Sequence, residues 1–433
     1  MASSSPAPPS RGWLHRSTLL PGRPVEPRRL YLLTRLLYGA LTGPATVIYG
    51  LYMVREAGLG PFELVILGVF IEGATLVGEV PTGVFADATS RRLSLIIGTA
   101  VMGAAHLVMG WVPEFAWIAT GQVLWGLGWT FRSGAEQAWL SDEIGEAEAN
   151  ATFALAAQRV QIGRLVSVPI VVGLALIDLQ APFLAAGAIY LALAAGLAMT
   201  MPERARPRAA GAQGGWGELL RPALEGARLI RGSGVLLALG AAAVLAGAWS
   251  ESLDRLWPLH LIEGIGLPDL FGLGEAGWFG VIALAVMAGS VASAGLARRV
   301  DVQDPRALGA ALALTVAVVI AAALAFALTR NFWVAVAALW LVQCARVPWE
   351  PLKLAWVNRG LAPASRATVL SAFGQADAIG QMAGGPVIGA VAAARGVVAA
   401  LAASTALLGL VLPAYGLAAR ASSSGRPAED AHD

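Results

Sequence analysis

The chain has 433 residues, of which 57% are hydrophobic and only 13% are charged, and its formal net charge is +2. A soluble domain carries about 25% charged residues, so this composition excludes an ordinary soluble protein, and it is too apolar for a disordered one. The single cysteine, Cys344, excludes a disulfide scaffold, and the four histidines are too scattered to suggest a metal cluster. Long apolar runs, rather than alternating strands, favour a helical membrane protein.

A helix that crosses a membrane needs about 20 mostly apolar residues. Residues 1–29 and 420–433 are predicted to be polar tails, and the first of these tails is predicted to be disordered. Residues 202–233 are rich in Pro, Arg and Gly and are predicted to form a linker. The predicted fold class is an all-α polytopic membrane protein with two six-helix bundles, at 30–201 and 234–419. The twelve predicted spans are residues 30–53, 62–85, 93–112, 115–140, 152–176, 181–201, 234–262, 276–297, 307–329, 332–357, 366–393 and 396–419.

Arginine and lysine are unevenly distributed among the segments between the spans. If the N-terminus lies inside, the inner segments carry 20 of these residues and the outer segments carry 3. Positively charged loops stay on the cytoplasmic side of a membrane. The sequence therefore predicts a multi-pass protein of the cell (inner) membrane, with both tails and the linker in the cytoplasm.

A weak internal repeat relates the two predicted bundles. At one offset of 217 residues, six positions of spans 4 and 5 match positions of spans 10 and 11. Two related halves around a central site are an architecture of membrane transporters. The matched residues of the first half are Ala138, Trp139, Gln158, Ile162, Gly163 and Pro169.

Between the second and third spans the chain reads Gly83-Val-Phe-Ala-Asp87-Ala-Thr-Ser-Arg91-Arg92. Gly83 permits a close helix approach, and Asp87 can accept hydrogen bonds from a helix N-terminus. Arg91 and Arg92 can hold carboxylates. This G-x-x-x-D-x-x-x-R-R segment resembles the loop signature of the major facilitator superfamily, although many members have glycine at the position of Ser90. The resemblance extends over roughly residues 30–420.

The resemblance implies a conformational role for the gating motif, defined here as Gly83, Asp87, Arg91 and Arg92. In the superfamily this cluster is taken to latch the inner gate while the protein faces outward. Asp87 and Arg91 would then control conformation and would not bind substrate. The alternative is that the two arginines only anchor the loop on the cytoplasmic side of the membrane, as positively charged residues do.

Many ionisable residues fall within the predicted spans, where each costs roughly 2.5–3.5 kcal/mol on the insertion scale. Such residues face the bundle interior or a water-filled cavity, so they are candidates for a cavity or proton-coupling role. The alternative is that they form structural salt bridges near helix ends. Spacing of four residues predicts opposite-charge pairs in spans 4, 7 and 10, which by resemblance line a central cavity. The candidates are Glu72, Arg132, Glu136, Glu251, Asp254, Arg255, Arg346, Glu350 and Asp377.

Spans 5 and 11 carry glycine and proline residues that are predicted to act in helix packing or as hinges. They are Gly163, Pro169, Gly380, Gly385 and Pro386. Drug antiporters of the superfamily often have a Gly-Pro pair in a glycine-rich span 5, which this chain matches better in span 11. Tryptophans near the charged pairs, Trp129, Trp249 and Trp349, would either line a cavity, or pack between helices or face lipid. His106, alone on an apolar helix, is predicted to be a packing residue.

These features predict a secondary active transporter that works by alternating access, with proton-coupled export of small, partly hydrophobic compounds as the leading hypothesis. A proton-coupled importer of a small metabolite is the first alternative, and a non-transporting receptor or assembly protein is the second. An enzyme is not expected, because no nucleophile–base pair or phosphate loop is visible. The expected partners are a small-molecule substrate, protons and the lipid bilayer, with no cofactor, no metal and no nucleic acid, and a monomer is expected.

Overall fold

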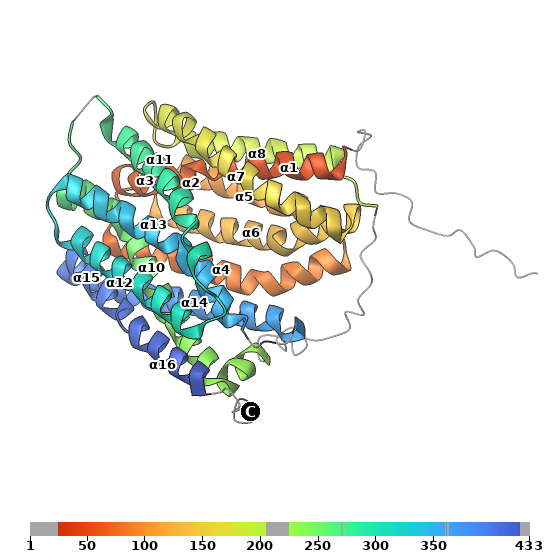
Figure 1. The fold of residues 1–433 in the computed structure, drawn as a ribbon. Helices are drawn as coiled ribbons and strands as arrows, with labels where there is room; N and C mark the ends of the chain where they lie inside the picture. Colours follow the sequence, from red (N-terminus) through yellow and green to blue (C-terminus); the bar gives the residue numbers. More distant parts are fainter. Residues whose placement is uncertain (1–24, 205–224, 270–271, 360, 362, 425–433) are drawn as a thin grey trace, which may run out of the picture.

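The computed structural model describes residues 25–204, 225–269, 272–359, 361 and 363–424. Within these segments the regular secondary structure consists of helices alone. Figure 1 shows the red-to-yellow helices of the first half beside the green-to-blue helices of the second. The all-helical, multi-span fold predicted from the composition is therefore confirmed.

The first span is broken into three helices, where the sequence predicted one element. Thr42 ends α1, and Pro44 lies in the first turn of α2. Proline has no backbone N–H to donate to the preceding turn, which interrupts the helix. The helices of the first half are α1 Pro27–Leu41, α2 Gly43–Val47, α3 Tyr49–Arg55, α4 Pro61–Ala88, α5 Arg91–Trp111, α6 Phe115–Ile144, α7 Glu146–Ala175 and α8 Ala181–Thr200.

The second half repeats this arrangement with breaks at different places. The seventh span continues from α10 into a π-helical turn, η1, and the twelfth divides into α15 and α16 around Gly409. The elements are α10 Gly234–Leu259, η1 His260–Ile265, α11 Gly274–Ala294, η2 Ala297–Arg299, α12 Pro305–Leu328, α13 Phe332–Val357, α14 Pro363–Arg395, α15 Val397–Leu408 and α16 Val411–Ser424.

Helices extend into segments that the sequence assigned to tails and linker. The first helix begins at Pro27, and α16 continues to Ser424. Residues 225–232, within the predicted linker, are also helical. The predictions for residues 1–24, 205–224 and 425–433 lie outside the described residues.

Nine helical stretches of the described chain are long and apolar enough to cross a membrane. The three predicted spans not among them are the helices α6 and α14 and the α1–α3 unit, whose longest helix has only 15 residues. Of these helices, α6 carries the buried charges Arg132 and Glu136, which belong to the site described below.

In the first half, α1 and α7 pack with their backbones in contact. A methyl group on Gly163 of α7 would overlap the carbonyl oxygen of Leu36. Reciprocally, a methyl group on Gly39 of α1 would overlap the carbonyl oxygen of Val160. Only glycine permits this approach, which is the small-residue packing expected between membrane helices.

The second half contains the same reciprocal contact between α10 and α14. Gly380 of α14 lies against the Val244 carbonyl, and Gly247 of α10 lies against the Asp377 carbonyl. Gly380 and Asp377 follow their first-half counterparts in α7 by 217 residues, the offset found in the sequence. The residues related by the internal repeat therefore make the same glycine-to-backbone contact in both halves.

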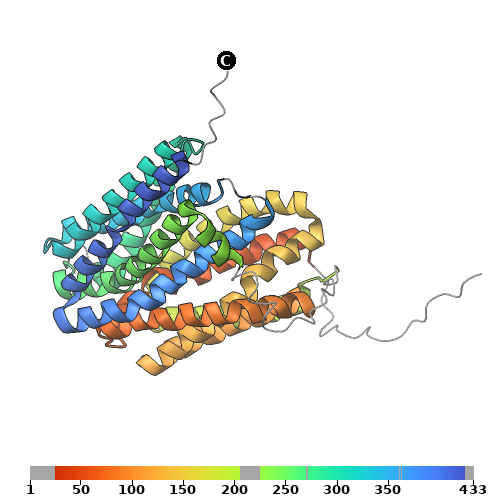
Figure 2. The same cartoon turned by 90° about the horizontal axis from the view of Figure 1, so that it is seen from below.

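The two halves meet mainly at one end of the molecule. A hydrophobic core there combines Leu51, Tyr52 and Phe183 of the first half with Leu259 and Phe279 of the second. We call this the closed end, and we call the opposite end, which carries the gating motif, the motif end. Figure 2 shows α4 (orange) running alongside α14 (blue), which is the longest contact between the halves.

Candidate functional site

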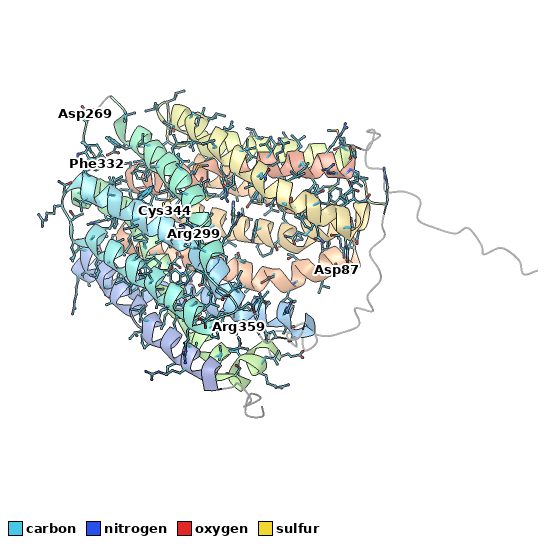
Figure 3. The ribbon with its side chains drawn as sticks, viewed as in Figure 1. Asp87, Asp269, Arg299, Phe332, Cys344 and Arg359 are labelled. Atoms are coloured by element: carbon cyan, nitrogen blue, oxygen red, sulfur yellow. The ribbon has the colours of Figure 1, made fainter. Side chains whose placement is uncertain are left out.

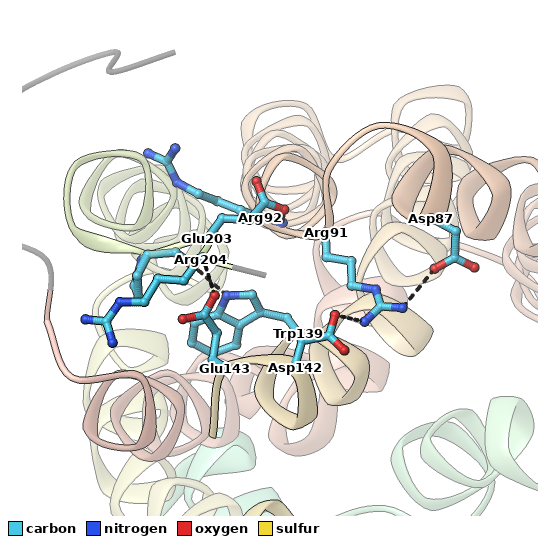
Figure 4. A network of polar contacts seen from close by, with 9 residues as sticks. Asp87, Arg91, Arg92, Trp139, Asp142, Glu143, Glu203 and Arg204 are labelled. Atoms are coloured by element: carbon cyan, nitrogen blue, oxygen red, sulfur yellow. Dashed lines mark hydrogen bonds and ion pairs between the residues drawn. The ribbon is translucent and has the colours of Figure 1, made fainter. Parts of the chain in front are cut away.

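At the motif end, Arg91 lies between two carboxylates. Its Nη2 is 3.3 Å from Asp87 Oδ1 on α4, and its Nη1 forms an ion pair with Asp142 on α6. Figure 4 shows the guanidinium reaching both carboxylates. Ser90 caps α5 by accepting a hydrogen bond from the Leu93 amide, which fixes where the helix carrying Arg91 begins. The motif thus ties α4, α5 and α6 together within the first half.

Arg92 makes a different contact from the one predicted. Its Nη2 donates to the Ala198 carbonyl at 2.5 Å, and its backbone N–H donates to Glu203 at 3.2 Å. The arginine side chain therefore holds the end of α8, and no carboxylate receives its guanidinium among the described residues. Glu203 also accepts a hydrogen bond from the Ser90 hydroxyl at 2.7 Å, so its carboxylate binds the first turn of α5 at two points.

Among the described residues, no hydrogen bond or ion pair joins the gating motif to the second half in this conformation. No atom lies within 4 Å of the position that a methyl group on Gly83 would occupy, and the Asp87 side chain is 62% exposed. Figure 3 shows Asp87 far from Arg299 and Arg359, which mark the motif end of the second half. The close helix approach predicted at Gly83 is therefore not made in this state.

A cleft separates the halves between α7 and α11. Its volume is about 790 Å³, and its walls include Gln161, Arg164 and Leu165 from α7 and Met287 and Val291 from α11. Figure 1 shows the two groups of helices spread apart toward the motif end. The structure is therefore closed at one end and open at the other.

The closed end is held by an ion pair as well as by the apolar core. Arg55 on α3 donates two hydrogen bonds, of 2.8 and 2.6 Å, to the carboxylate of Glu275 on α11. The pKa of the Arg55 guanidinium is raised, chiefly by this hydrogen bond with Glu275. Gly50 of α3 also lies directly against Pro258 of α10.

A buried charge cluster lies inside the first half. Glu136 on α6 is 3.2 Å from Arg132 on the same helix and 3.1 Å from Arg35 on α1. Arg132 and Glu136 are only 3% and 7% exposed. The predicted pair in span 4 therefore forms, and Arg35 adds a second cation. The guanidinium groups of Arg35 and Arg132 also lie over the ring of Tyr38, at 5.4 and 4.8 Å.

A small cavity adjoins this cluster. Its volume is about 20 Å³, and its lining includes Tyr31, Thr34, Arg132 and Glu136. A buried water needs about 10–15 Å³, so one water molecule fits here. Nε and Nη1 of Arg132 have no partner among the described protein atoms. A water molecule in this cavity could therefore accept a hydrogen bond from Arg132 that no described protein atom accepts.

The second half contains a larger polar pocket of about 320 Å³, lined by residues of α10, α13 and α14. Arg346 of α13 donates two hydrogen bonds to Asp254 of α10, at 2.6 and 2.9 Å. The predicted pairing of Arg346 with Glu350 is therefore wrong. Asp254, which belongs to another helix, forms the ion pair with Arg346. Glu350 instead lies 2.6 Å from Lys353.

Aromatic and amide groups complete this pocket. Asp377 of α14 accepts a hydrogen bond from Gln381 at 2.8 Å. Trp249 and Trp349 both line the pocket, with ring centroids 6.2 Å apart. The guanidinium of Arg346 lies 5.3 Å from the Trp249 ring centroid. The two tryptophans therefore line the cavity and also pack between helices.

The third predicted pair lies near the junction of the halves. Glu251 and Arg255 of α10 are 2.7 Å apart, as their spacing predicted. Glu251 is 4% exposed and fits against Gly68 of α4, where a side chain would displace it. Glu72 is half-buried on α4, and no described residue forms a salt bridge with it. The pair therefore contributes to the contact between halves.

His106 is the residue whose surroundings the sequence did not anticipate. It is fully buried, and its Nδ1 donates to the Met102 carbonyl at 2.8 Å, which leaves Nε2 as an acceptor. Nε2 has no partner among the described residues, and His106 lines a cavity of about 120 Å³ with Gln122, Trp125 and Arg255. A lone histidine in an apolar helix gives no sequence signal for such a cavity.

The predicted hinge residues of the two halves have different surroundings. Pro169 lies inside α7, and Pro386 lies inside α14. A methyl group on Gly385 would lie 3.2 Å from Val69 of α4. Gly385 therefore faces the other half, whereas Gly163 and Gly380 pack within their own halves.

The sequence of residues 31–385 matches the family model of the Major Facilitator Superfamily. The chain belongs to the major facilitator superfamily. A search of curated proteins finds no match to this chain.

Solved structures share the fold of this superfamily member. The nucleoside transporter NupG superimposes with a TM-score of 0.70 at 15% identity, covering 93% of this chain and 100% of that chain. A bacterial homolog of the human lysosomal transporter Spinster, in an inward-facing and occupied conformation, has a TM-score of 0.70 at 15% identity, covering 94% and 100%. The peptide transporter POT in complex with sulfate has a TM-score of 0.66 at 16% identity, covering 93% and 97%.

Membership of the superfamily establishes the general activity. The chain is a multi-pass membrane protein and a secondary transporter of small molecules, and it is not an enzyme. Two six-helix bundles are the architecture of this fold. At these identities the solved structures show the fold alone. The substrate must therefore be inferred from the residues of this chain.

Proposed function

We propose that this superfamily member exports small, partly hydrophobic compounds in exchange for protons, by alternating access. The observation that carries the proposal is Glu136, a buried carboxylate shared by Arg132 of its own helix and Arg35 of α1. Ionisable groups within a membrane are costly and are commonly part of ion or proton pathways.

A proton on Glu136 would change the forces between helices. The ionised carboxylate binds both arginines with charge-assisted hydrogen bonds, which are about twice as strong as neutral ones. The protonated acid releases that attraction and leaves the buried Arg132 and the partly exposed Arg35 near each other without their counter-charge. Because Arg35 lies on α1, which packs against α7 beside the cleft, proton binding would act on a wall of the opening between halves.

The sidedness follows from the distribution of positive charge. The motif end carries the loops rich in arginine, so it lies in the cytoplasm, together with the tails 1–29 and 420–433 and the linker 202–233. The present conformation is then open to the cytoplasm, the side from which an exporter loads. The protein acts as a monomer in the cell membrane.

The gating motif would close the cytoplasmic end in the alternate conformation. In the described part of the chain no helix of the second half lies against Gly83, and Asp87 pairs only with Arg91 and is largely exposed, so both are available to it. When the halves rotate, Gly83 admits a helix of the second half and Asp87 meets its N-terminus. Arg91 keeps Asp87 oriented in both conformations.

Export is favoured over import by α14. Its sequence from Gly380 to Pro386 partly matches the glycine-rich Gly-Pro segment of drug antiporters in the superfamily, which those proteins carry in span 5 and this chain carries in span 11. In this structure the segment packs against α10 through Gly380 and against α4 through Gly385. A helix that contacts both halves at glycines can slide at both surfaces during exchange.

The test compares the wild type with Glu136→Gln at equal membrane abundance. In a drug-sensitive bacterial host the wild type is expected to raise resistance to some antibiotics, dyes or biocides, and Glu136→Gln to abolish this. In everted vesicles an imposed pH gradient should drive uptake by the wild type only, while substrate exchange without a gradient persists in Glu136→Gln. Glu146→Gln, which removes an exposed carboxylate, is the matched control.

Two outcomes would contradict the proposal. Gradient-driven export that survives in Glu136→Gln would remove Glu136 as the proton carrier. Accumulation of metabolites in intact cells, with no export of any compound in the panel, would establish the importer instead.

A further inference from the structure

The pocket of the second half carries more negative than positive groups. Asp254, Glu350 and Asp377 contribute three carboxylates, and Arg346 and Lys353 contribute two cations. The pocket therefore has a formal charge of −1 when all five groups are ionised. A cavity of about 320 Å³ is large enough for a small organic ligand.

The ion pairs inside the pocket identify which carboxylate remains unpaired. Asp254 is bound by both terminal nitrogens of Arg346, and Glu350 is bound by Lys353. Asp377 receives only the side-chain amide of Gln381, and no described cation lies within salt-bridge distance of it. An unpaired carboxylate in a membrane protein is stabilised by any cation that the pocket admits.

The walls beside Asp377 suit the body of an organic cation. Trp249 and Trp349 present two indole rings at an angle of 42°. Trp249 already binds a cation through its ring, because the Arg346 guanidinium lies 5.3 Å from its centroid. Attraction between a cation and an aromatic face is strongest for tryptophan and increases when water is excluded.

One residue of the pocket wall carries an unused polar group. Trp249 is 1% exposed, and its Nε1–H has no acceptor among the described residues. A buried donor without a partner is uncommon in a native protein and calls for an explanation. Because this N–H is itself shielded from solvent, the wall offers a ligand its indole rings, and the N–H becomes available only if Trp249 moves.

We infer that the second-half pocket binds organic monocations, with the positive group beside Asp377 and an aromatic or alkyl body against Trp249 and Trp349. This inference rests on the proposed function and specifies its substrate class. Arg346 and Lys353 stay paired with Asp254 and Glu350, so neither is free to bind an anion, and one negative charge remains for the ligand.

The test measures binding to the purified full-length protein in lipid nanodiscs by titration calorimetry. Three probes share a benzyl or phenyl body and differ in charge: benzyltrimethylammonium, benzyl alcohol and benzoate. The wild type is expected to bind the cation about tenfold or more tightly than the alcohol, a difference of about 1.4 kcal/mol, and not to bind benzoate.

Variants locate the binding at Asp377. Asp377→Asn should lose about tenfold of its affinity for the cation, the size typical of one charged contact, while benzyl alcohol changes by less than about twofold. Asp377→Glu should retain cation binding. Glu263→Gln, which removes an exposed carboxylate of η1 outside the pocket, should match the wild type.

Either of two results overturns the inference: benzoate binding the wild type as tightly as the cation, or Asp377→Asn binding the cation as the wild type does. The comparison of probes on the wild type decides the matter even if a variant does not fold. Because these measurements need no proton gradient, their failure would leave proton-coupled export through Glu136 standing. Conversely, cation binding without gradient-driven export would overturn only the proposed function.

Discussion

The two histidines buried in the helix bundles differ in what their ring nitrogens contact. His260 Nε2 hydrogen-bonds the Phe326 carbonyl at 3.1 Å. That carbonyl lies in the last turn of α12, where no backbone amide of the helix can bond it. His106 instead keeps Nε2 unpaired, beside a cavity. The first histidine caps a helix, and the second holds an unused acceptor.

We expect leucine substitutions at these histidines to have unequal effects. His260→Leu leaves the Phe326 carbonyl without a donor, which should cost about 1–3 kcal/mol of the free energy of unfolding. His106→Leu removes an unsatisfied polar atom, and its helical partner Met102 keeps its backbone hydrogen bond. Thermal unfolding in the same detergent should therefore show a lower midpoint for His260→Leu and an unchanged or higher midpoint for His106→Leu. A larger loss at His106 would show that Nε2 is satisfied by bound water.

Residue spacing predicted some of the charge pairs and not others. Two of the pairs form within a single helix, Arg132 with Glu136 and Glu251 with Arg255. For these pairs a spacing of four residues is enough to predict the contact. Arg346 follows the same spacing and yet binds Asp254 on another helix. Which helix supplies the partner depends on packing, and a single sequence carries no direct record of it.

Within each half, two helices depend on glycine for their contact. At Gly163 the α1 and α7 backbones touch, and at Gly173 of the same helix no atom lies within 4 Å of an added methyl group. We expect Gly163→Ala to push the helices apart and cost about 1–3 kcal/mol, the usual cost of overpacking. Gly173→Ala should instead stabilise the helix by about 0.5–1 kcal/mol.

Unfolding midpoints of the two alanine variants, measured beside the wild type, check this difference. The midpoint is expected to fall for Gly163→Ala and to rise for Gly173→Ala, although both variants add one methyl group to the same helix. If both variants lower the midpoint equally, the glycine contact with Leu36 is not what positions α7.

The boundaries of most helices could be predicted from the length of the apolar runs, but the breaks could not. The predicted span 332–357 coincides with α13, whereas the predicted span 30–53 is three helices. Pro44 was visible in the sequence as a break signal. A proline inside an apolar run is compatible with either a kink or an interruption, and neighbouring helices decide between them.

The closed end should open during transport, because alternating access requires both ends to move. Arg55 and Glu275 form the ion pair that joins the halves there. In a protein with cysteines at both positions, R55C and E275C, a short bifunctional thiol reagent should link α3 to α11 and stop transport. Cys344 is buried, so the native chain provides a background of low thiol reactivity.

Transport assays before and after cross-linking check this prediction. Each single-cysteine variant treated with the same reagent is the control and should remain active. A cleavable reagent should allow activity to return after reduction. Full activity of the linked protein would mean that this end does not separate.

At the scale of the whole molecule, the fold was predictable from the sequence and the conformational state was not. Composition, span number and the Gly83–Arg92 segment indicated a two-bundle transporter. A transporter adopts each of its conformations with one sequence, so nothing in the residues specifies which end is open. The exposed Asp87 and the paired Arg55 are properties of this state.

The position equivalent to Glu136 in the second half is Lys353, 217 residues later, and it is the only lysine of the 433 residues. Its Nζ lies in the second-half pocket, 2.6 Å from Glu350, with 15% of the side chain exposed. Reductive methylation with carbon-13 formaldehyde would therefore place a label at one lysine side chain and at the N-terminal amine. The wild-type transporter thus contains a site for a spectroscopic reporter inside its cavity, without any substitution.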